Sequence, residues 1–203
     1  MYNDKPLDAR LAAWLVYPLR DTAVTPNHLT SARLLAGIVA CALLATGEPG
    51  PANAGALFLV LSNFLDHTDG ELARITGKTS KFGHYYDLAS DAVVDILLFA
   101  GIGFGLMHGP LGTGALFMGI LAGVSVAAIF QLRLMISNIT GKFQIEQPNI
   151  GLFEIEDVFY LMPLITFFGL LQPFLVIAVI VAQEFAQWTL LQYLGCKKGH
   201  SCS

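Results

Sequence analysis

The stretch from Ile96 to Leu132, ILLFAGIGFGLMHGPLGTGALFMGILAGVSVAAIFQL, contains no charged residue. A helix needs roughly 20 mostly apolar residues to span a bilayer, so this stretch holds parts of two spanning helices, joined at His108-Gly109-Pro110. The rest of the chain is similarly apolar. Of its 203 residues, 55% are hydrophobic and 13% are charged, whereas soluble domains carry about 25% charged residues. The sequence therefore predicts an integral membrane protein.

Extending outward from this stretch, the same reasoning predicts an all-α protein with six transmembrane helices. The first two are separated by Gly47-Glu48-Pro49-Gly50-Pro51, and Gln172-Pro173 precedes the sixth. We expect a six-helix transmembrane domain over 25–195 and a cytoplasmic tail over 196–203. The expected spans are about 27–46, 52–73, 81–107, 112–138, 150–170 and 173–194.

Residues 1–24 show a different pattern. Leu7, Leu11 and Leu15 recur at helical spacing, with Trp14 beside them and charged residues outside the stripe. This pattern predicts an N-terminal amphipathic helix that lies in the membrane interface. A helix packed against the ends of the transmembrane bundle would show the same pattern.

The basic residues predict the orientation of the chain. With six spans, every Lys and Arg falls before the first span, near its start, in every second connection, or after the sixth span, and the other three connections contain none. The positive-inside rule makes the basic face cytoplasmic, so both termini are expected inside the cell. The formal net charge of −4 argues against nucleic acid as a partner.

Acidic residues gather at the cytoplasmic ends of the second and third spans. Asp66 and Asp69 are three residues apart and share a helix face, while Asp87, Asp91 and Asp95 form a row at intervals of four. Acids inside a membrane are costly, and several converging ones repel each other unless a cation neutralises them. Carboxylate oxygens are the ligands that magnesium and manganese prefer, so the pattern predicts a metal site.

Small residues accompany these acids. Gly70, Ala73 and Gly83 leave room beside the predicted metal site. Because magnesium is commonly held by a few carboxylates together with substrate phosphates, a diphosphate is the ligand we expect there. The simpler alternative, an ion pair of Asp66 or Asp69 with Arg74, leaves Asp87 and Asp91 without partners.

These residues form Asp66-x-x-Asp69-Gly70-x-x-Ala73-Arg74 followed by Gly83-x-x-x-Asp87-x-x-x-Asp91, which resembles the signature of the CDP-alcohol phosphotransferases at all of its defining positions. Pro26-Asn27-x-x-Thr30-x-x-Arg33 is similar to a second, looser element of that family. The resemblance implies a metal-dependent enzyme of phospholipid biosynthesis. Such an enzyme transfers a phosphatidyl-type group from a CDP-linked lipid, such as CDP-diacylglycerol, to the hydroxyl of an alcohol and releases CMP.

The resemblance also implies roles for the residues. Asp66, Asp69, Asp87 and Asp91 would bind two ions of Mg²⁺ or Mn²⁺, and Asp91 would also act as the general base. The residues implied to line the pocket for the cytidine diphosphate are Gly70, Ala73, Arg74 and Gly83, with Thr30 as a weaker candidate.

The alcohol acceptor stays open at this point. A phosphorylated acceptor needs a cation, for which Arg133 is the candidate, although Arg133 is equally suited to an interfacial anchor. An amino alcohol would prefer the acids and the aromatic residue that open the fifth span: Glu154, Glu156, Asp157 and Tyr160. A different class of protein, an ion or proton-coupled transporter, would also carry acids in its membrane segments.

Small residues follow one another along the fourth span, and they include Gly114, Ala115, Gly119, Ala122, Gly123, Ala127 and Ala128. Such residues favour close packing between helices in lipid, either within the chain or across a homodimer. We expect a homodimer from this composition and from the family resemblance.

Overall fold

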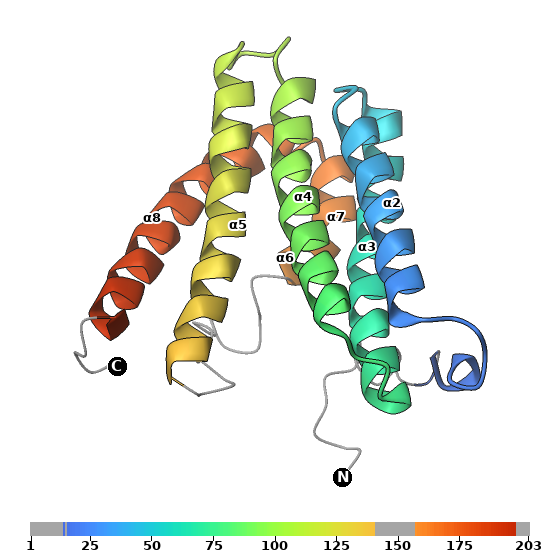
Figure 1. Ribbon diagram of the computed structural model, residues 1–203. Helices are drawn as coiled ribbons and strands as arrows, with labels where there is room; N and C mark the ends of the chain where they lie inside the picture. Colours follow the sequence, from blue (N-terminus) through green and yellow to red (C-terminus); the bar gives the residue numbers. More distant parts are fainter. Residues whose placement is uncertain (1–13, 15, 141–156, 198–203) are drawn as a thin grey trace.

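The computed structural model describes residues 14, 16–140 and 157–197, and every regular element in these ranges is a helix. Helices run along the chain from the short 3₁₀ turn η1 to the long helix α8 (Figure 1). Their bounds are Tyr17–Leu19 for η1, Pro26–Leu44 for α2, Pro49–Thr76 for α3, Lys81–Gly105 for α4, Gly114–Thr140 for α5, Asp157–Tyr160 for α6, Met162–Phe167 for α7 and Leu171–Lys197 for α8.

The long helices form a bundle in which neighbouring helices pack on one another. α2 contacts both α3 and α4, α4 contacts α5, and α5 contacts α8. α6 and α7 pack on α3, while α8 leans away from the other helices (Figure 1). The backbones of α3 and α4 do not approach each other, so α2 is the element that joins them.

Of the helices in the described ranges, four are long and apolar enough to cross a membrane: α2, α4, α5 and α8. They correspond to the first, third, fourth and sixth predicted spans. α3 covers the second predicted span and has 28 residues, but the acids and other polar residues at its ends lower its hydropathy. An all-α integral membrane protein is therefore confirmed, while the count of six spans is not and stays a prediction.

The predicted fifth span, 150–170, is not one continuous helix in its described part. Residues 157–167 form two short helices, α6 and α7, with Leu161 between them. Pro163 explains the break, because proline has no backbone N–H and clashes with the preceding turn of a continuing helix. It stands within the first two positions of α7, where proline is tolerated.

The predicted interfacial helix over 1–24 lies largely outside the described residues. In the described part, Tyr17–Leu19 form a single 3₁₀ turn. The side chains of Trp14 and Tyr17 are exposed, whereas Val16 is buried. The interfacial helix therefore stays a prediction.

Glycine residues allow the central helices to approach each other closely. A Cβ atom at Gly119 of α5 would lie 2.2 Å from the carbonyl oxygen of Phe99 in α4, and one at Gly101 of α4 would lie 2.7 Å from the carbonyl oxygen of Cys41 in α2. Ala115 and Ala122 of α5 are fully buried. The small residues of the fourth predicted span are thus largely used for packing within the chain.

We expect Gly119→Ala to destabilise the protein by about 1–3 kcal/mol, because the added methyl group collides with the backbone of α4. The measurement is the midpoint of thermal unfolding in mild detergent. Gly114→Ala is the matched control on the same helix, since a Cβ atom there meets nothing within 4 Å. Equal midpoints for the two variants would contradict the close α4–α5 contact.

Candidate metal centre and adjoining cavity

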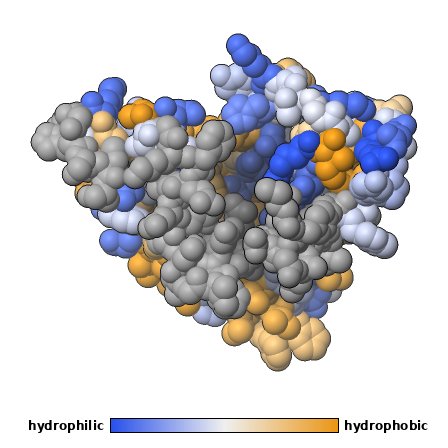
Figure 2. Space-filling model, turned by 90° about the horizontal axis from the view of Figure 1, so that it is seen from below, coloured by the Kyte–Doolittle hydropathy of each residue, from blue (hydrophilic) through white to orange (hydrophobic). Residues whose placement is uncertain are grey.

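The predicted site residues come together at one end of the bundle, where α3 ends and where α2 and α4 begin (Figure 1). The short connection between α3 and α4 is well defined. α3 ends at Gly77, whose φ of +66° is a left-handed conformation that favours glycine. α4 begins after Ser80, whose hydroxyl accepts a hydrogen bond of 2.9 Å from the backbone N–H of Gly83. Hydrophilic residues line part of the rim of a hollow in this end of the molecule (Figure 2).

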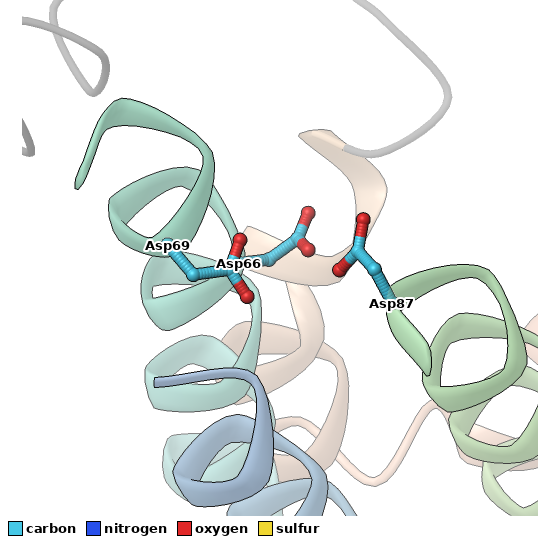
Figure 3. Close-up of side chains that lie close together, drawn as sticks. All are labelled: Asp66, Asp69 and Asp87. Carbon is cyan, nitrogen blue, oxygen red and sulfur yellow. The ribbon is translucent and has the colours of Figure 1, made fainter. Parts of the chain in front are cut away.

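Three of the predicted aspartates converge on one point. Asp66 and Asp69 project from α3 toward Asp87 of α4 (Figure 3), and one carboxylate oxygen from each lies within 4.8 Å of the others. Oxygen donors gathered this closely fit a hard divalent cation. The structure therefore supports the predicted metal site for Asp66, Asp69 and Asp87.

A buried arginine stands among these acids. The guanidinium of Arg33, on α2, forms ion pairs with Asp66 and Asp91, and with Asp87 at 2.7 Å. Its Nε lies 3.6 Å from Asp69. Arg33 is only 5% exposed, so its charge is not screened by water as a surface charge would be. One cation from α2 thus faces all four aspartates of the motif.

The sequence does not predict that Arg33 pairs with the aspartates, although it places Arg33 in a motif of the family. Arg33 belongs to the looser element at the start of the first span. A basic residue at that position is also expected from the positive-inside rule, so its presence alone does not indicate a role in the site. The alternative drawn from the sequence pairs Asp66 or Asp69 with Arg74. In the structure, both acids face Arg33 instead. The signal in the sequence was an arginine placed inside a helix of apolar residues, a costly position that calls for an acidic partner.

Asp91 lies one turn after Asp87 on α4. Its carboxylate accepts a hydrogen bond from Arg33, and its side chain is 41% exposed. It is not one of the three acids whose oxygens cluster most closely. Asp91 therefore sits beside the candidate metal centre and remains accessible from outside it.

The residues predicted to bind cytidine diphosphate surround the same end of the bundle. The hydroxyl of Thr30 donates a hydrogen bond of 2.7 Å to Asp69. A Cβ atom at Gly83 would lie 2.8 Å from the side-chain oxygen of Asn27, so α2 and α4 touch there. Beside Gly70, in contrast, the nearest atom to such a Cβ is a nitrogen of Arg74 at 3.5 Å. Space is therefore open on the Gly70 face of α3.

Arg74 extends toward the surface, with its side chain 67% exposed. It lies 3.4 Å from the buried carboxylate of Glu71 and donates a hydrogen bond of 3.2 Å to the carbonyl oxygen of Gly70. Ala73, next to it, is partly buried. Arg74 is thus exposed beside Gly70 and paired with Glu71.

A cavity of about 340 Å³ adjoins the aspartates on the side of α5. Asp66 and Asp91 form part of its wall, together with Asp95 and Arg133. No residue that the structure describes forms an ion pair with Arg133. The candidate cation for the acceptor and the candidate base thus line one cavity.

Among the residues expected to favour an amino alcohol, only Tyr160 has a described side chain. Glu154 and Glu156 lie outside the described ranges, as does the side chain of Asp157. Tyr160 is described but does not line the cavity.

Comparison with known proteins identifies the class. Residues 23–188 match the CDP-alcohol phosphatidyltransferase family. This match covers most of the chain and includes all the motif residues described above. The chain therefore belongs to the CDP-alcohol phosphatidyltransferase family, which favours an enzyme over an ion transporter.

Particular relatives are more informative about chemistry. The chain is 38% identical over 89 residues to the archaetidylinositol phosphate synthase of Pyrococcus horikoshii, covering 43% of this chain and 45% of that protein. It is 35% identical over 104 residues to the bifunctional IPC transferase and DIPP synthase of Thermococcus kodakarensis, covering 51% of this chain and 23% of that protein. The matched region is thus less than half of each relative's length.

We expect Arg33→Gln to destabilise the protein by about 3–5 kcal/mol in the presence of a chelator, because four carboxylates would lose the cation between them. Thermal unfolding in mild detergent measures this loss, and added Mg²⁺ should recover part of it. Arg74→Gln serves as the control, since its exposed side chain contributes at most about 1 kcal/mol. A chelated Arg33→Gln protein as stable as the wild type would contradict the role of Arg33.

Proposed function

We propose that this protein transfers the substituted phosphoryl group of a CDP-linked lipid to the hydroxyl of an alcohol and releases CMP. The observation that carries the proposal is the position of the cavity beside the aspartates. Asp66 belongs both to the group of three converging carboxylates and to the cavity wall, and Asp91 lines the same wall. A nucleotide at the carboxylates and an alcohol in the cavity would meet at these two residues.

The proposed metal is Mg²⁺ or Mn²⁺, bound as two ions. The clustered oxygens of Asp66, Asp69 and Asp87 support one such site, and Asp91 is the further ligand that we propose for the second. When bound, these ions neutralise the charge of the diphosphate and of the departing CMP. Thr30 orients Asp69 through its hydrogen bond of 2.7 Å, which fixes the direction of that carboxylate.

The remaining steps use side chains of the chain itself. Asp91 accepts the proton of the acceptor hydroxyl, which a neutral alcohol must lose as it attacks. A bond forms between that oxygen and the lipid-linked phosphorus, and the bond from this phosphorus to the oxygen of CMP breaks. Arg74, with Gly70, Ala73 and Gly83, is proposed to hold the cytidine diphosphate. Arg33 keeps the carboxylates oriented, since it contacts residues of both helices.

We further propose that the acceptor is phosphorylated. Arg133 supports this proposal, because its half-buried guanidinium lines the cavity together with Asp91. A guanidinium can bind a phosphate through two parallel hydrogen bonds. The relative from Pyrococcus horikoshii, an archaetidylinositol phosphate synthase, bears the name of an enzyme whose product includes an inositol phosphate.

The proposed setting is a membrane in which the site and both termini face the cytoplasm. The basic residues of the described part stand at the same end of the bundle as the site, which supports this orientation by the positive-inside rule. We also propose a homodimer, as expected from the sequence. Protease accessibility of the C-terminal tail tests the orientation, and cross-linking in mild detergent that yields only monomer would argue against the dimer.

We expect Asp91→Asn to lower CMP release from CDP-diacylglycerol by at least about 100-fold, because the amide cannot accept the acceptor's proton. Removal of divalent metal by a chelator should abolish release in the wild type. The assay uses purified protein, Mg²⁺ and a panel of alcohols that includes glycerol 3-phosphate, inositol, inositol phosphate, serine, choline and ethanolamine.

Asp21→Asn is the control for this assay, because Asp21 is an exposed acid that pairs with Arg20 at 2.9 Å away from the site. It should retain full activity. Equal CMP release by the Asp91→Asn and wild-type proteins would exclude Asp91 as the base. Wild-type protein that binds neither CDP nor metal would overturn the proposed reaction altogether.

We expect Arg133→Gln to raise the KM for a phosphorylated acceptor by about 10- to 100-fold, because a charge-assisted hydrogen bond is lost. The KM for the CDP-linked donor should change little. Lys197→Gln, at the end of α8, is a control that removes a positive charge outside the cavity. A parallel rise in both KM values would contradict a role for Arg133 in acceptor binding alone.

A further inference from the structure

The wall of the cavity beside the aspartates holds a buried hydrogen-bond donor that has no partner among the described residues. The side-chain amide nitrogen of Asn63, on α3, is shielded from solvent and forms no hydrogen bond with any residue that the structure describes. Asn63 lines the cavity together with Asp66, Asp91 and Arg133. Buried donors are almost always paired, and an unpaired one costs free energy. A site that retains such a group calls for a ligand that pairs with it.

We propose that Asn63 is a specificity-determining residue whose side-chain amide turns toward a polyol acceptor bound in this cavity and donates a hydrogen bond to one of its hydroxyl oxygens. This inference rests on the proposed function, since it assigns a residue to the acceptor of that reaction. It also narrows the substrate class to an acceptor with at least one hydroxyl besides the one that reacts.

The position of Asn63 suits this role. It precedes Asp66 by three residues on α3, so the two side chains share a face of that helix. Asp66 is part of the candidate metal centre, where the reacting phosphorus would stand. A hydroxyl held by Asn63 would therefore lie about one helical turn deeper in the bundle than the reacting hydroxyl.

Several other polar groups of the cavity wall are already engaged. The hydroxyl of Ser62 donates a hydrogen bond of 2.8 Å to the carbonyl oxygen of Arg33, and the carboxylates of Asp66 and Asp91 face the guanidinium of Arg33. The donors of the wall that no described residue engages by hydrogen bond or ion pair are Asn63, Gln131 and Arg133, and of the two amides only Asn63 lies on the same helix as Asp66. An uncharged amide suits a hydroxyl oxygen, whereas the guanidinium suits a phosphate.

The cavity has a suitable size for such an acceptor. Its volume of about 340 Å³ lies at the lower end of the range of roughly 300–1,000 Å³ that is typical of sites for small molecules. The wall combines these polar groups with apolar side chains that include Leu59, Leu98 and Phe130. A small phosphorylated polyol would fill this space and meet the amide of Asn63 with a hydroxyl.

The test compares Asn63→Leu with the wild type in CMP release, with inositol phosphate and glycerol 3-phosphate as acceptors. We expect the KM for the preferred acceptor to rise by about 3- to 10-fold, as the loss of one hydrogen bond predicts. The turnover number and the KM for CDP-diacylglycerol should stay within about twofold. Asn63→Ser, which keeps a donor, should recover part of the acceptor affinity.

Asn53→Leu is the matched control. Asn53 also lies on α3 and also has a buried side-chain oxygen without a described partner, but it does not line the cavity. Both leucine variants remove a buried amide from the same helix, so a purely structural effect would appear in both. Monodeoxy analogues of the acceptor add a second criterion. One analogue should bind the wild type more weakly, yet bind Asn63→Leu no more weakly than the full acceptor does.

Binding measured without turnover separates this proposal from the proposed reaction. Titration of inositol phosphate or glycerol 3-phosphate against thermal unfolding of the metal-loaded protein gives an affinity even if no CMP is released. Weaker binding by Asn63→Leu than by Asn53→Leu would support the role of Asn63, whatever the outcome of the reaction. Equal binding by both variants and the wild type, or no binding of either polyol phosphate, would overturn it.

Discussion

The site depends on one buried cation. Arg33 reaches from α2 to four carboxylates on two other helices, α3 and α4, whose own backbones remain apart. Without it, the acids would repel each other across the space that separates these helices. The packing of α2 on α4 is therefore part of the site, and Gly37 and Gly101 make that packing close, since a Cβ atom at either would lie 2.7 Å from the neighbouring helix.

This arrangement is demanding, because a buried charge is stabilising only when its partners are in place. The guanidinium compensates a single charge, while the motif brings four carboxylates. The remaining negative charge suits the divalent cations that we propose, and these cations would in turn bind the diphosphate of the donor. Fold stability depends on the pairing of these carboxylates with Arg33, and the proposed metal binding depends on the charge that Arg33 leaves uncompensated, so each side chain of the cluster affects both.

The acids of the site could be predicted from sequence, because their intervals of three and four residues place them on one helix face. Acids in apolar helices are also costly, which points to a functional role. An all-helical membrane fold could likewise be predicted. The sequence could indicate that Arg33 needs an acidic partner, but not which acids it contacts, since a contact between residues more than 30 positions apart depends on how helices pack. The break between α6 and α7 was not predicted, because residues 150–170 have the length of a spanning helix even though Pro163 interrupts them. The cavity was invisible for a further reason: its wall combines residues of α2, α3, α4, α5 and α6.

The cavity lies beside only some of the carboxylates of the site. Asp66 and Asp91 line it, while Asp69, Gly70 and Gly83 do not. The proposed function therefore places the alcohol on the cavity side of phosphorus and the departing nucleotide on the side of those motif residues. The incoming and departing oxygens would then lie in line, as in a direct displacement. A transfer of this kind takes place in one step, without a covalent enzyme intermediate, and inverts the configuration at phosphorus.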